Sequence, residues 1–150
     1  YAHSPSLGEP AICVYILPPL LDRMDIQVFV SREQVSTGIV KTNGPDITAI
    51  RDSISRARTR QIERLSPAGL VTNSEIGHKT VDTFCILEPS AERLLQSVVN
   101  QRHLSLRAYH KIKKIARTIA DLEDSERIGE RHIAEAMSLR INESIIPQAA

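Results

Sequence analysis

The sequence places an arginine, Arg107, at the beginning of a predicted helix, two residues after the capping residue Ser105. The first turn of a helix is partially positive and presents backbone N–H groups, so an anion is favoured there. An arginine in that turn adds its fork of donors to these N–H groups, and together they can hold a phosphate. The alternative is an arginine that is simply solvated at the helix start.

A second arginine, Arg23, lies within Leu20–Asp25, directly before a predicted strand. On a short turn at the start of a strand, an arginine projects from the edge of an α/β layer and can reach a neighbouring molecule. An arginine in that position stabilises the charge on a phosphoryl group during its transfer. The alternative is a surface ion pair of Arg23 with Asp22 or Asp25, which contributes little to stability.

Arginines also recur along a predicted helix that begins after Asp46. Arg56, Arg60 and Arg64 are four residues apart, so they lie on one helix face. Such a stripe could follow the phosphate backbone of a nucleic acid. The alternative is a solvated face, partly neutralised by Asp52 and Glu63. No aromatic residues interleave with the arginines, so base stacking is not indicated.

Further basic residues follow Arg107 in the same predicted helix: His110, Lys111, Lys113 and Lys114. We expect them on the outer side of this helix. There they would either add to a phosphate site or only keep the surface soluble.

Composition and missing motifs exclude several functions. The 150 residues carry a formal net charge of +1, so no global field attracts nucleic acid or anionic lipid. Cys13 and Cys85 are far apart, which argues against a zinc site or a disulfide framework and fits a reducing cytoplasm. The five histidines have no metal-binding spacing, so no metal site is expected. No GxxxxGK[ST] loop is present, and the chain alone is not expected to bind ATP tightly or to hydrolyse it.

Periodicity predicts a mainly α fold, a helical bundle preceded by a short α/β remnant with about one strand. The remnant covers residues 1–32, with the strand at Asp25–Arg32, and a linker covers 33–45. The helical domain covers 46–142, and 143–150 form a disordered tail. No run of apolar residues is long enough to span a bilayer. The first residues lack Met and favour a piece of a longer protein.

Helices are predicted where apolar residues recur with helical spacing between capping residues. One begins after Asp46, with an apolar face of Ile47, Ile50, Ile54, Ala57, Ile62 and Leu65. A weaker one covers 73–84, the next begins at Pro89, another is capped by Ser105, and the last begins near Gly129.

Four segments together resemble magnesium-chelatase-like AAA+ ATPases of the YifB/ComM type. Pro19–Ile26 resembles the end of their AAA+ core, where the family usually reads G-P-L-L-D-R-I-D. Ala49–Gln61 resembles the first helix after their core. Leu104–Leu122 is similar to their lid signature, and Ile128–Ala136 to the helix that follows it.

The resemblance implies a lid domain attached to the last part of an AAA+ core, in rings that are typically hexameric. It implies that Arg23 is an arginine finger acting in trans, with Asp22 positioning its turn, and that Arg107 is the sensor-2 arginine for nucleotide. ATP and Mg²⁺ are expected in the full-length protein and none on this chain alone. The expected partners are the rest of the core, neighbouring subunits and DNA, and the expected activity is that of a cytoplasmic, DNA-acting motor in natural transformation. The alternative is a non-enzymatic helical module that binds nucleic acid or a protein partner through Arg56, Arg60 and Arg64.

Overall fold

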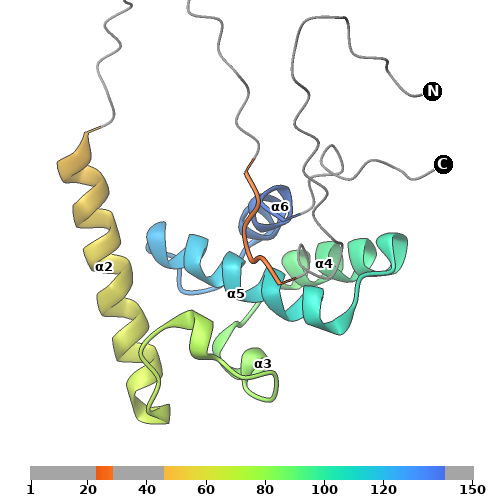
Figure 1. Ribbon diagram of the computed structural model, residues 1–150, viewed down its shortest axis with the longest axis horizontal. Coiled ribbons are helices and arrows are strands. Elements are labelled where there is room, and N and C mark those ends of the chain that lie inside the picture. The colour runs from red at the N-terminus through yellow and green to blue at the C-terminus, as the bar shows by residue number, and fades with distance from the viewer. Residues whose placement is uncertain (1–22, 29–45, 141–150) are drawn as a thin grey trace, which may run out of the picture.

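The computed structural model describes residues 23–28 and 46–140. Their elements follow one another in the order α2 (Ile47–Leu65), η1 (Ser66–Ala68), η2 (Asn73–Glu75), α3 (Val81–Phe84), α4 (Pro89–Arg102), α5 (Leu106–Leu122) and α6 (Glu130–Ser138). Figure 1 shows α5 running through the middle, with α2 upright along one side. α6 contacts both α5 and α4, and α2 contacts α5. The described fold is mainly helical, as predicted.

Local sequence signals determine where the helices begin. The Asp46 carboxylate accepts two backbone N–H groups at the start of α2, and the Ser105 hydroxyl accepts one at the start of α5. Pro89 is the first residue of α4, a position where its missing N–H costs nothing. Before α6, Ile128 and Ile133 are both fully buried on either side of the cap, as a hydrophobic staple requires.

The hydrophobic core lies between α4, α5, α6 and the connection that contains α3. Ile112, Ala116 and Ile119 of α5 face it at helical spacing. The chain before α4 and the chain before α6 meet in a parallel bridge between Leu87 and Ile128, which is the sole β pairing among the described residues. The bridge closes the end of the bundle where both helices begin.

The predicted strand at Asp25–Arg32 is not observed in its described part. Residues 25–28 are irregular, and residues 29–32 lie outside the described part of the chain. The backbone N–H of Gln27 donates instead to the carbonyl of Leu139 just after α6, at 2.7 Å. A strand needs a neighbouring strand to pair its backbone N–H and C=O groups. Residues 25–28 are irregular and pack against helices, which offer no such pairing.

The helix predicted over 73–84 was also wrong in its extent. The segment forms two short pieces, η2 and α3, separated by a loop from Ile76 to Thr80 that contains Gly77. Glycine has a low helix propensity, and the apolar residues on either side, Ile76 and Val81, still reach the core. Ile76 and Val81 are thus both buried, although the backbone between them forms a loop and not a helix.

Only the C-terminal half of α2 packs on the domain. Ala57 and Leu65 of its predicted apolar face are buried, together with the polar Gln61. The other members of that face are exposed: Ile47, Ile50, Ile54 and Ile62. Figure 1 shows the N-terminal half of α2 projecting beyond α5. Helical spacing identified an apolar face, but no described element covers most of it.

The helical region begins with α2, whose cap is the first residue of the predicted domain at 46. The predicted linker at 33–45 and tail at 143–150, and residues 1–22 of the predicted remnant, lie outside the described residues. Among the helices that are described, none has the length and apolar character needed to cross a bilayer.

Candidate functional site

Arg107 lies in the first turn of α5, as the sequence predicts. The Ser105 hydroxyl accepts the backbone N–H of Ala108 at 3.1 Å and so fixes the direction in which this turn points. Ala108 is buried against the domain, whereas Arg107 beside it is exposed. The guanidinium therefore belongs to the solvent side of α5 and is not part of the core.

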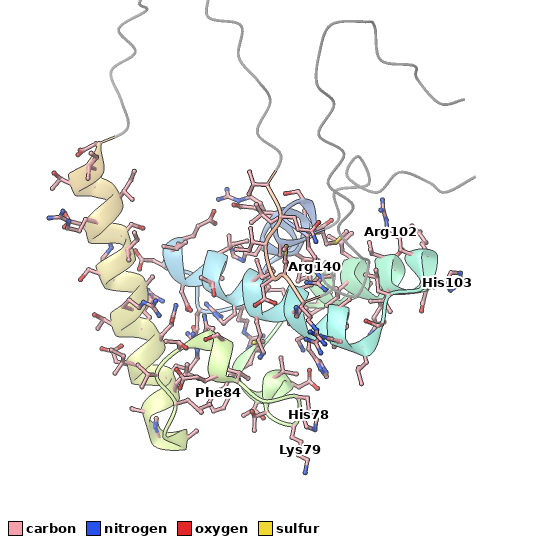
Figure 2. All side chains as sticks on the ribbon, in the orientation of Figure 1. His78, Lys79, Phe84, Arg102, His103 and Arg140 are labelled. Carbon is pink, nitrogen blue, oxygen red and sulfur yellow. The ribbon has the colours of Figure 1, made fainter. Side chains whose placement is uncertain are left out.

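The surface around Arg107 is a shallow depression of about 440 Å³. Its lining residues are mostly basic or imidazole side chains: His78, Leu106, Arg107, His110, Lys111 and Lys114. All except His78 come from the first turns of α5. Figure 2 shows His78 on the loop before α3, below α5. This loop supplies the wall opposite the helix.

The cations of the depression are partly held by oxygen atoms of the surrounding backbone. Lys114 donates to the carbonyl of Ser74 at 3.1 Å, and Lys111 donates to the carbonyls of Arg23 and Met24. Burial lowers the pKa of His110, so its ring is neutral near pH 7 and can act as a hydrogen-bond donor or acceptor. The positive charge of the depression therefore comes from arginine and lysine.

A phosphate group fits the chemistry of this depression. It would meet one guanidinium and two ammonium groups next to the positive end of a helix dipole. None of the described residues that line the depression is acidic, although the ammonium of Lys111 also pairs with the carboxylate of Asp25 at 2.7 Å. The arrangement can bind and orient a phosphate, but it offers no nucleophile or paired acid for cleaving one.

Arg23 lies on the segment 23–28, which Figure 1 shows crossing α5 close to α6. The side chain of Arg23 is exposed. Its neighbour Asp25 forms an ion pair with Lys111 at 2.7 Å, which differs from the Arg23–Asp25 pair weighed from the sequence. Asp22 lies outside the described residues.

The three arginines of the predicted nucleic-acid stripe all have acidic partners within the domain. Arg56 and Arg60 contact Asp124 at 3.5 and 3.0 Å. Arg64 forms a two-pronged pair with the fully buried carboxylate of Asp121, with both N–O distances at 2.8 Å. These contacts attach α2 to the end of α5 and reduce the positive charge that the stripe presents to solvent.

Asp121 also binds two residues outside α2. Asn73 donates to it at 2.8 Å, and Arg117 donates its Nε–H at 3.1 Å. Arg117 is itself buried and donates to the carbonyl of Glu126 in the turn after α5. Burial lowers the pKa of Arg117, and the neighbouring Asp121 carboxylate opposes that change. Three segments of the chain, α2, η2 and α5, thus meet at one carboxylate.

Two further positions differ from the sequence analysis. Lys113 is buried and pairs with Asp82 of α3, so it is not on the outer side of α5 with Lys111 and Lys114. His78 was not associated with Arg107 at all, because it reaches the depression from a loop 29 residues earlier. No periodic signal in the sequence connects such a loop to a helix start.

Comparison with known proteins identifies the family. Residues 45–140 match the family described as the C-terminal part of the magnesium chelatase subunit ChlI. Competence protein ComM of Haemophilus influenzae is 34% identical over 123 residues, which cover 81% of this chain and 23% of that protein. The uncharacterized protein YifB of Escherichia coli is 30% identical over 125 residues, which cover 81% of this chain and 24% of that protein. The chain thus spans about a quarter of the length of these relatives. It belongs to the family of magnesium chelatase ChlI C-terminal domains.

Proposed function

We propose that this chain is the nucleotide-sensing lid and arginine-finger region of a magnesium-chelatase-like AAA+ ATPase. The observation that carries the proposal is the basic depression at the start of α5. Arg107 lines it together with Lys111 and Lys114, and no carboxylate is found among its described lining residues. In this role Arg107 contacts the phosphates of the nucleotide bound by its own subunit.

The rest of the polypeptide supplies the parts that this chain lacks. We expect the phosphate-binding loop and the magnesium ligands there. Among residues 23–28 and 46–140, no three His, Cys, Asp or Glu side chains are arranged to hold a metal ion. We propose that the chain alone is inactive and that ATP and Mg²⁺ join it only at the surface of the core.

Arg23 has the complementary role in this proposal. It reaches the γ-phosphate held by the adjacent subunit of a ring, a hexamer as the family resemblance implies, and stabilises the charge that develops during transfer. Its exposure on the described segment supports a contact with a second molecule.

The lid moves as a rigid unit in this proposal. The buried network around Asp121 joins α2, which follows the linker, to α5, which carries Arg107. A change at the phosphate site is therefore transmitted to the linker at 33–45 as a rotation of the whole domain.

The relatives support a motor that acts on DNA. One of them is named as a competence protein, which agrees with the natural-transformation motor that the family resemblance implies. We propose the same class of substrate here, with a cytoplasmic ring as the active form.

Titration of this chain with inorganic tripolyphosphate tests the phosphate site directly. We expect saturable shifts of the backbone amide NMR signals of Leu106–Lys111, with a millimolar dissociation constant. Arg107→Ala should weaken this binding about tenfold or more, because it removes a charge-assisted hydrogen bond worth about 1.5–3 kcal/mol.

The matched control is Arg102→Ala, which removes the same charge from the end of α4. Figure 2 shows Arg102 at the end of α4 with His78 on a different segment, and Arg102 does not line the depression. This variant should bind like the wild type when ionic strength is held constant. Equal affinity of the wild type and Arg107→Ala would contradict the phosphate site.

A further inference from the structure

The turn that carries Arg23 is fastened to the lid by two cations and one backbone hydrogen bond. Lys111 of α5 pairs with Asp25, and Arg140 donates to the carbonyl of Met24 at 2.9 Å. The N–H of Gln27 donates to the carbonyl of Leu139. Figure 2 shows Arg140 beside this segment, where it crosses α5. The segment is thus held at three successive points.

Lys111 makes the largest part of this contact. Its ammonium lies 2.7 Å from a carboxylate oxygen of Asp25, 3.0 Å from the carbonyl of Arg23 and 3.4 Å from the carbonyl of Met24. Three acceptors match the three N–H donors of an ammonium group. The side chain is only 14% exposed, so these acceptors replace most of its water.

The same side chain lines the phosphate depression. Lys111 follows Arg107 by one helical turn and so lies on the same face of α5. Its ammonium is therefore shared between two places, the depression on one side and the turn that carries Arg23 on the other.

We propose that Lys111 is a positioning residue that couples the two nucleotide contacts of one subunit. The inference rests on the proposed function of Arg107 and Arg23. A phosphate in the depression competes with Asp25 for the ammonium of Lys111, because both are anions within its reach. When the phosphate is present, the hold on the Arg23 turn weakens, and the finger that faces the next subunit changes position. The nucleotide state of one site is thereby passed to the neighbouring site.

The tripolyphosphate titration of this chain also tests the coupling, when it is followed at the amides of Asp25 and Gln27. Gln27 does not line the depression. In the wild type these signals should shift with the same dissociation constant as that of Arg107, and amide exchange of Gln27 should become faster. A lysine that only stabilises the fold would leave both readouts unchanged on titration.

Lys111→Met keeps the aliphatic stem and removes the charge. In this variant Arg107 should still titrate, and the response of Asp25 and Gln27 should disappear. Asp25→Asn, which leaves the lysine in place, should abolish the same response and keeps the test decisive if Lys111→Met folds poorly. The matched control is Lys114→Met, which removes the same charge from the depression but should retain the response of Asp25 and Gln27.

The outcomes separate the two proposals. If the wild-type Arg107 amide does not shift with tripolyphosphate, the phosphate site itself is wrong. If Arg107 titrates while Asp25 and Gln27 do not respond, or if they respond equally in Lys111→Met, the coupling is wrong and the phosphate site stands.

Discussion

Arg107→Ala in the full-length ATPase should lower the turnover number by about 10²–10³-fold, the usual effect of removing one donor that stabilises transition-state charge. The physical reason is the position of the guanidinium at a depression whose described lining residues are basic or neutral. The Arg107 side chain is exposed, so the variant leaves the hydrophobic core intact and removes a contact with nucleotide. Steady-state phosphate release at saturating ATP measures the effect.

The control for this variant is Arg102→Ala, which should keep the turnover of the wild type. Circular dichroism should show the same helical content and melting temperature in both variants. Normal turnover in Arg107→Ala would remove the sensor assignment, whatever the affinity of the depression for free phosphate.

Asp121→Ala should destabilise the domain by about 3–5 kcal/mol, the cost of removing one partner from a buried ion pair. Asp121 is fully buried and is contacted by Arg64, Arg117 and Asn73. Its removal leaves the buried Arg117 guanidinium without its carboxylate and detaches α2 from α5. Urea unfolding, followed by circular dichroism, measures the change in the free energy of unfolding.

Asp124→Ala is the matched control, because Asp124 pairs with Arg56 and Arg60 of the same helix at the surface. These side chains are about half exposed, so the lost ion pairs should cost about 1 kcal/mol or less. Alanine at the left-handed φ of 57° of Asp124 adds a backbone cost of about 1 kcal/mol. Asp121→Asn retains the size of the side chain and should lie between the two. A cost of Asp121→Ala no greater than that of Asp124→Ala would show that the network does not hold α2 in place.

The sequence predicted the helix starts well, because caps are local. Asp46, Pro89 and Ser105 each act through atoms within a few residues, so their type and position are sufficient. In α5, Ile112, Ala116 and Ile119 reach the core at helical spacing, whereas Leu122 at the end of the same pattern is exposed. The loop between η2 and α3 was missed, although a five-residue step turns a helix by about 140° and would not place the buried Ile76 and Val81 on one face.

Contacts between distant segments could not be predicted in the same way. Arg64 was expected in a solvated or nucleic-acid-binding stripe, yet its partner Asp121 lies 57 residues away. Lys113 and Lys114 are adjacent in the sequence, but only Lys113 forms an ion pair with Asp82 of α3. Ile47, Ile50 and Ile54 are spaced as one apolar face of a helix, yet all three are exposed. Helical spacing does not predict whether another element covers such a face.

In the candidate site, too, local sequence predicts some residues, and contacts between distant segments determine the others. Arg107 was identified from its helix position and from the family resemblance, both of which need only local sequence. His78 and the contact of Lys111 with the Arg23 turn depend on how loops fold over α5, which local sequence does not encode.

Mixing two inactive variants of the full-length protein tests the central claim, that Arg107 serves the subunit's own nucleotide while Arg23 serves the neighbour's. In a ring assembled from equal amounts of Arg23→Ala and Arg107→Ala subunits, some sites combine an intact Arg107 with an intact neighbouring Arg23. Random assembly makes about a quarter of the sites complete, so turnover should rise well above that of either variant alone, up to about a quarter of the wild-type value. A mixture that stays as inactive as the separate variants would place both arginines in the same subunit's site and contradict the account.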